Sequence, residues 1–91
     1  MDLIERREAK RVRVELQATI EGSAGQRPLG AVVRDISESG ARLEGADLAA
    51  SPELFNLTIM QASGETETRR ARLVWWTEGR IGVRFSDYIG A

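Results

Sequence analysis

A strict alternation of apolar and polar side chains is the feature that most limits what this 91-residue chain can fold into. It begins directly after Arg11 and continues without interruption to Glu21. Successive side chains of a β-strand point to opposite faces of a sheet, so a period of two predicts a strand with one buried and one solvated face. The apolar side chains that would share the buried face are Val12, Val14, Leu16, Ala18 and Ile20.

Further short segments show similar strand patterns, and turn residues separate them at intervals of roughly ten residues. Glycine, serine and proline gather in the intervening stretches, and residues 47–53 predict a loop or one helical turn interrupted by Pro52. Six short strands at this spacing indicate an all-β protein in which a six-stranded antiparallel sheet closes into a β-barrel. The remaining predicted strands are residues 30–36, 41–44, 54–61, 71–77 and 81–85.

The two ends of the chain differ from the barrel region. Residues 2–10 are good helix formers and predict a short helix or a mobile arm, whereas residues 86–91 are too few for more than one helical turn. A chain of this length supports one packed core. We therefore expect a single domain over residues 1–91, with an N-terminal arm at 1–11 and the barrel at 12–86.

Two adjacent tryptophans, Trp75 and Trp76, face opposite sides of a regular strand. The phase shared with Ala71 and Leu73 predicts that Trp75 lies in the core and Trp76 on the outside. There, Trp76 would cover a barrel end, lie in an interface or stack on a ligand base. Packing or an interface is the favoured role.

The composition excludes several kinds of catalytic site. The chain has no His and no Cys, so Cys/His zinc sites, thiol nucleophiles, disulfides and Ser–His relays are ruled out. The sequence has neither a P-loop nor a Rossmann glycine pattern, and no pair of carboxylates has a spacing typical of hydrolases. We expect a protein that is not an enzyme and that uses no metal or cofactor.

The apolar segments are also too short for a membrane protein built on helices. The longest uninterrupted apolar runs are a few residues, far below the roughly 20 that span a bilayer. The first residues mix both charge signs and contain no apolar signal-peptide core. These features predict a cytoplasmic location without membrane insertion.

Four positive charges lie close together just before the first predicted strand, at Arg6, Arg7, Lys10 and Arg11. In a helix, the pairs four residues apart would repel each other. Guanidinium groups bind phosphate through paired hydrogen bonds and can also contact the O6 and N7 atoms of guanine. A guanine nucleotide would therefore suit this cluster. Taken alone, the segment is better explained as a solvated charged arm.

A second polar motif, Asp-x-Ser-x-x-Gly, follows the second predicted strand. Strand geometry places Asp35 and Ser37 on one face and directs Ile36 into the core. An exposed Asp35 carboxylate can accept hydrogen bonds from a guanine edge, and Ser37 can donate to a phosphate or ribose oxygen. Gly40 would permit a positive φ or the close approach of a ligand. Ordinary turns also favour these residue types, so alone this motif is weak.

Together, the two motifs are more specific. Arg-x-x-x-Arg (Arg7 and Arg11) precedes the first strand, and Asp-x-Ser-x-x-Gly (Asp35 to Gly40) follows the second about two dozen residues later. In this arrangement the sequence resembles the PilZ family, small β-barrels that bind the second messenger cyclic di-GMP. The resemblance covers nearly the whole chain and includes residues 5–7, 11–12, 35–40, 74–75 and 82–85.

The resemblance implies a ligand clamp with two sides. Arg7 and Arg11 on the arm would contact the phosphates and one guanine, and Arg6 would assist or replace Arg7. Asp35 and Ser37 would meet the other guanine and the sugar–phosphate ring from the barrel surface. Gly40 would hold the turn. The residues expected to bind cyclic di-GMP are thus Arg6, Arg7, Arg11, Asp35, Ser37 and Gly40.

The resemblance also implies a signalling role. Ligand binding would order the arm and relay the signal to an effector protein that the sequence does not identify. Many family members have a C-terminal helix over one barrel opening, whereas only residues 86–91 remain here, which leaves a homodimer as another way to cover the opening.

Two alternatives remain open. One is a PilZ-like interaction module that binds no nucleotide. The other is a small barrel that binds single-stranded nucleic acid, against which count the net charge of −1 and the low aromatic content of 5%. We therefore expect no nucleic-acid partner.

Overall fold

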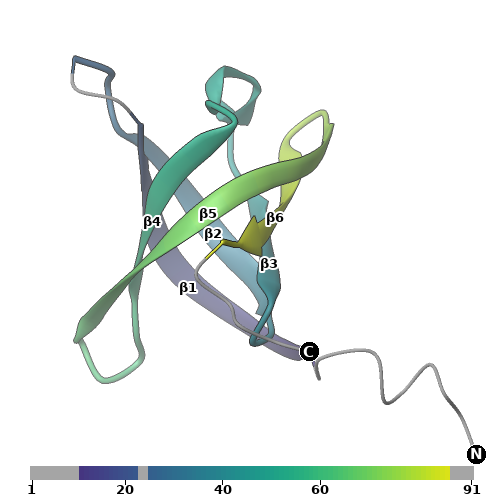
Figure 1. Ribbon diagram of the computed structural model, residues 1–91. Helices are drawn as coiled ribbons and strands as arrows, with labels where there is room; N and C mark the ends of the chain where they lie inside the picture. Colours follow the sequence, from purple (N-terminus) through teal and green to yellow (C-terminus); the bar gives the residue numbers. More distant parts are fainter. Residues whose placement is uncertain (1–10, 23–24, 87–91) are drawn as a thin grey trace, which may run out of the picture.

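The computed structural model describes residues 11–22 and 25–86 and contains the six predicted strands (Figure 1). Residues 47–53 include one turn of 3₁₀ helix at Leu48–Ala50, as expected. Residues 1–10 of the arm predicted over 1–11, and the last five residues, lie outside the described part of the chain. The strands are β1 (Val12–Glu21), β2 (Leu29–Ile36), β3 (Gly40–Glu44), β4 (Leu54–Met60), β5 (Thr66–Thr77) and β6 (Arg80–Phe85).

The strands form a closed barrel in the order β1-β2-β3-β6-β5-β4, and every neighbouring pair is antiparallel. Closure depends on β4 returning to β1, where Ala18 pairs with Ile59 and Ile20 with Leu57. Figure 1 shows β1 and β4 side by side where this pairing occurs. The predicted all-β, six-stranded antiparallel barrel is confirmed.

The core fills the inside of the barrel with the apolar side chains that alternation assigns to the inner face. Val33, Leu43, Leu57 and Ile59 have no exposed surface. Along β1 the burial is graded, because Ala18 and Ile20 are buried whereas Val12 is 53% exposed. The buried apolar residues are Ala18, Ile20, Ala31, Val33, Ala41, Leu43, Leu48, Phe55, Leu57, Ile59, Ala71, Ile81, Val83 and Phe85.

The strand register is irregular at several places, and two of the irregularities change which face a side chain occupies. In β2, the pairing with β3 shifts between Val33 and Asp35. In β5, the pairing with β6 shifts between Leu73 and Trp75. A β-bulge of this kind adds one residue to one strand and so reverses the inside–outside alternation beyond it. The extra residues are Arg34 and Val74.

The bulge at Val74 overturns the prediction that Trp75 lies in the core. Trp75 pairs with Gly82, whose neighbours in β6 face inward, and Trp75 is 40% exposed on the outer face. Its indole lies against Gly82 so closely that a Cβ on that residue would overlap the ring. The same bulge also overturns the expected outside position of Trp76, because Trp76 pairs with the buried Ile81 and so takes the inward phase, although 49% of it remains exposed.

No helix long and apolar enough to cross a membrane occurs in the part of the chain that the structure describes.

Candidate functional site

The turn between β2 and β3 is held by Ser37. The Ser37 N–H donates to the Gly40 carbonyl at 2.8 Å, and the Ser39 N–H donates to Ser37 Oγ at 3.2 Å. Ser37 Oγ also lies 3.2 Å from Ser39 Oγ and 3.4 Å from the Gly40 carbonyl oxygen. The hydroxyl therefore closes the turn, a role that serine often has in such turns.

Position 40 needs a glycine because the backbone of β6 lies very close to it. Gly40 pairs with Arg84, and a Cβ at this position would overlap the carbonyl oxygen of Val83. Its φ is not positive, so that expected reason for a glycine is wrong. The close approach here is to the backbone of a neighbouring strand, and it brings the turn tightly against the barrel.

Asp35 lies on the outer face, as expected, because the bulge at Arg34 reverses the alternation that follows Val33. Beyond the bulge Asp35 pairs directly with Arg42 of β3, and Ile36 pairs with Ala41. Asp35 would otherwise continue the inward phase of Val33. This single extra residue thus brings a carboxylate out of the barrel.

The expectation of an exposed Asp35 carboxylate is wrong, because two arginines cover it. Arg11 Nη1 donates to Oδ1 at 2.8 Å, and Arg42 Nε donates to Oδ2 at 2.6 Å. Arg42 Nη2 also contacts Oδ2. The side chain of Asp35 is 4% exposed, whereas those of Arg11 and Arg42 are about half exposed. The carboxylate is therefore satisfied from within the chain, and the two cations face outward.

The structure brings part of the predicted site together. Arg11 and Asp35 are separated by 24 residues in the sequence and form an ion pair. Ser37 and Gly40 lie on the turn that follows Asp35. Arg6 and Arg7 lie outside the described residues.

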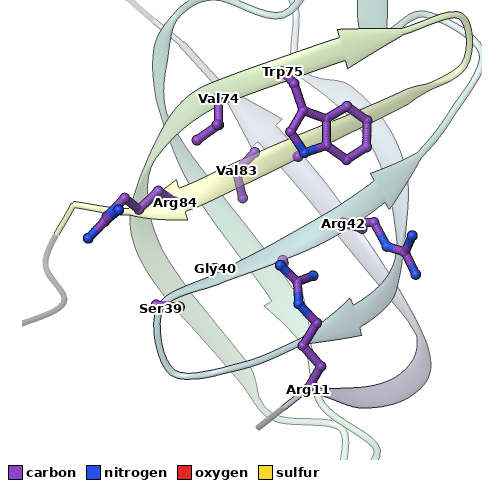
Figure 2. A pocket seen from close by; sticks show the side chains of 10 residues that line it. Arg11, Ser39, Gly40, Arg42, Val74, Trp75, Val83 and Arg84 are labelled. Atoms are coloured by element: carbon purple, nitrogen blue, oxygen red, sulfur yellow. The ribbon is translucent and has the colours of Figure 1, made fainter. Parts of the chain in front are cut away.

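A pocket of about 510 Å³ opens on the outer face of β3, β5 and β6, beside Arg11 (Figure 2). Its volume is within the range of small-molecule sites. Figure 2 shows Arg11, Arg42 and Arg84 around an opening that Trp75 borders on one side. The lining residues are Arg11, Ser39, Gly40, Ala41, Arg42, Val74, Trp75, Gly82, Val83 and Arg84.

The pocket combines two kinds of recognition group. Guanidinium groups donate several hydrogen bonds and bind phosphates or carboxylates strongly. The indole of Trp75 offers an apolar aromatic surface next to them. Such a surface fits a small anion that also carries planar rings. Asp35 and Ser37 are not on the pocket wall, and Asp35 is covered by the two arginines that are.

The sequence interpretation did not name Arg42, Trp75 or Arg84 as site residues. Arg42 and Arg84 carry a usable signal, because each lies between two inward apolar residues of a short strand and must face outward. Trp75 carries no such signal, since its phase relative to Leu73 indicates the core. Only the bulge at Val74 places it on the pocket.

The sequence profile of the PilZ domain matches residues 5–90 of this chain. The chain belongs to the PilZ domain family. Among solved structures, the PilZ domain of CeSA from a cellulose-synthesizing bacterium matches with a TM-score of 0.68 and 19% sequence identity, covering 91% of this chain and 84% of that one. None of the curated proteins matches the sequence. PilZ domains are generally cyclic di-GMP-binding and regulatory modules rather than enzymes.

Proposed function

We propose that this PilZ domain binds cyclic di-GMP in the pocket beside Arg11 and relays binding to an effector protein. The observation that carries the proposal is the Arg11–Asp35 ion pair at the mouth of a pocket rich in guanidinium groups. This ion pair joins Arg11 of the Arg-x-x-x-Arg motif to the Asp35 carboxylate of the Asp-x-Ser-x-x-Gly motif. The match of the family profile over residues 5–90 supports the same ligand.

The chemistry of the pocket suits this ligand. Cyclic di-GMP carries two phosphates and two guanines, and arginine side chains can bind either group. Arg11, Arg42 and Arg84 provide cations around the opening, and Trp75 provides an aromatic wall for a base. The ligand would be bound and released unchanged, without a cofactor.

The proposed ligand contacts extend the clamp expected from the sequence. Arg7 joins Arg11 on the phosphates and one guanine, with Arg6 assisting, while Asp35 and Ser37 meet the other guanine and the ring. The neutralised arginines and the ligand then present a new surface to an effector. Such a change, driven by charge-assisted hydrogen bonds, is a common basis for switches.

Isothermal titration calorimetry with cyclic di-GMP tests the proposal. We expect micromolar or tighter binding by the wild type, and a loss of roughly tenfold or more in affinity for Arg11→Ala and for Asp35→Ala, because each removes a charged hydrogen-bonding group. The matched control is Arg27→Ala. Arg27 is an exposed arginine before β2, at the end of that strand away from Asp35, and it should leave the affinity unchanged.

The outcomes separate the alternatives. No heat with the folded wild type at micromolar concentrations would leave the interaction module that binds no nucleotide as the better description. Wild-type affinity in Arg11→Ala would show that binding occurs but that the clamp is assigned to the wrong residues. A loss in Arg27→Ala equal to that in Arg11→Ala would show only a general charge effect.

A further inference from the structure

Asp35 divides its two carboxylate oxygens between arginines from different parts of the fold. Arg11 occupies Oδ1 through one contact, from Nη1. Arg42 occupies Oδ2 through two contacts, from Nε and Nη2. Since the carboxylate is almost completely buried, each oxygen depends on these partners rather than on water.

The strand pairing fixes the backbone of Arg42 but not that of Arg11. Arg42 lies within β3, directly opposite Asp35, and both neighbours of Arg42 are buried in the core. Arg11 precedes β1, so its backbone lies outside the sheet pairing. A single contact from the end of a strand breaks more easily than a double contact from its interior. Arg11 is therefore the partner that can exchange.

We propose that Arg42 is a positioning residue, which keeps Asp35 paired with a cation and aimed at the pocket when Arg11 leaves the carboxylate for the ligand. The inference rests on the proposed function and adds a residue outside both sequence motifs. Arg11 moves from Oδ1 to a phosphate, and a guanine edge takes its place on Asp35. Arg42 stays on Oδ2 throughout.

This exchange solves a problem of charge. If Asp35 had only Arg11, moving Arg11 to a phosphate would leave a buried carboxylate without a cation, which is strongly unfavourable. With Arg42 in place, the carboxylate keeps a paired charge while Oδ1 becomes available. A carboxylate offers about four acceptor positions, two on each oxygen, so Arg42 can keep both positions of Oδ2 while the two positions of Oδ1 become available to the donors of a guanine edge.

The proposal predicts a change in base selectivity rather than a loss of affinity alone. Guanine offers donors at N1 and N2 to a carboxylate, whereas the hypoxanthine of cyclic di-IMP lacks the N2 amine. In the wild type, an aimed Asp35 should favour cyclic di-GMP over cyclic di-IMP by about tenfold, the value of one hydrogen bond to a charged group. A displaced Asp35 should lose this preference.

The experiment measures both ligands by calorimetry with Arg42→Gln and with Arg84→Gln as the matched control. Arg84 lines the same pocket and makes no contact with Asp35 among the described hydrogen bonds and ion pairs. We expect Arg42→Gln to reduce the selectivity ratio to between one and about threefold. Arg84→Gln should weaken both ligands equally and keep the wild-type ratio.

A double-mutant cycle with Asp35→Asn tests whether Arg42 changes the selectivity ratio through Asp35. In the Asp35→Asn background, Arg42→Gln should produce no further change in the ratio, because the group that it positions is already altered. If Arg42→Gln fails to fold, Arg42→Lys replaces it in the test. Arg42→Lys keeps the charge without the double contact, so we expect a selectivity ratio between those of the wild type and of a displaced Asp35. Thermal unfolding of each variant identifies any that do not fold.

The results distinguish this inference from the proposed function. An unchanged ratio in folded Arg42→Gln or Arg42→Lys would overturn the positioning role while cyclic di-GMP binding stands. Equal loss of both ligands would show that Arg42 contacts the ligand itself, which also contradicts the inference. No binding by the wild type would overturn the proposed function and this exchange with it.

Discussion

The Asp35 carboxylate lies on the outer face of the barrel, where Arg11 and Arg42 cover it and pair with its charge. A buried charge is tolerated when it is paired and hydrogen-bonded, and both of its oxygens accept charged hydrogen bonds here. Arg11 and Arg42 keep about half of their surface exposed, so their remaining donors face the pocket. At the scale of the residue, the same contacts that satisfy Asp35 therefore hold two arginines at the wall of the pocket.

Gly40 gives a residue-scale prediction about stability. Gly40→Ala places a Cβ against the backbone carbonyl of Val83, which cannot move without disturbing the β3–β6 pairing. We expect a loss of about 1–3 kcal/mol in the free energy of unfolding, measured by urea denaturation. The matched control is Gly30→Ala, because no atom lies within contact distance of a Cβ there.

Gly30→Ala should change the free energy of unfolding by less than about 0.5 kcal/mol or increase it slightly. If Gly40→Ala were as stable as Gly30→Ala, the close approach of β6 would not explain the glycine at position 40.

At the scale of the element, bulges in β2 and β5 determine what reaches the outer face. The extra residue Arg34 aligns Asp35 with Arg42, and the extra residue Val74 aligns Trp75 with Gly82. Bulges occur often next to functional sites, where they redirect a side chain. Both redirected side chains here contact groups of one surface, since Trp75 borders the pocket and Asp35 holds two of its arginines.

A pair of deletions tests the bulge in β5. Deleting Val74 removes only the extra residue, so Leu73 stays opposite Val83 and Trp75 stays opposite Gly82. We expect this variant to keep a cooperative thermal transition by circular dichroism. Deleting Arg70 interrupts regular pairing with Asn56 and moves residues on one side of it to the opposite face.

The Arg70 deletion should therefore lose the cooperative transition that the Val74 deletion retains. The opposite order of stability would show that Val74 is part of the regular ladder and that the bulge is assigned wrongly.

At the scale of the whole molecule, the closed barrel provides a rigid wall and the candidate site lies on its outside. Closure pairs each strand with two neighbours, and the core fills the interior, so the pocket beside Arg11 lies on the outer surface. Ligand binding to such a folded site stabilises the native state, because the unfolded chain does not bind. The pocket and the stability of the molecule are therefore linked.

Thermal unfolding with added nucleotide tests this linkage. Cyclic di-GMP at 100 times its Kd should add about 2.7 kcal/mol to the free energy of unfolding and raise the Tm by roughly 10 °C or more. A short single-stranded oligonucleotide should leave the Tm unchanged, because the chain has a net charge of −1 and few aromatic residues. A Tm that rises with the oligonucleotide and falls with added salt would favour the nucleic-acid-binding barrel instead.

Most of the fold could be predicted because its signals are local. The alternation of Ala18 and Ile20 with polar residues depends on the geometry of one strand, as does the inward phase of Ile81, Val83 and Phe85. Of the candidate site, the outward direction of Asp35 was predicted, but its burial was not. The cover comes from Arg42 across the β2–β3 pair and from Arg11, and neither contact has a local signal.

The sequence by itself determined the number of strands, their alternation and the two motifs, because these depend on neighbouring residues along the chain. Only the tertiary structure decided that Trp75 faces the pocket and that Arg42 holds Asp35. Both depend on the register between strands, and one extra residue in a strand reverses the face of every residue beyond it. A register is set by pairing across the whole barrel, and the alternation within a single strand carries no information about that pairing.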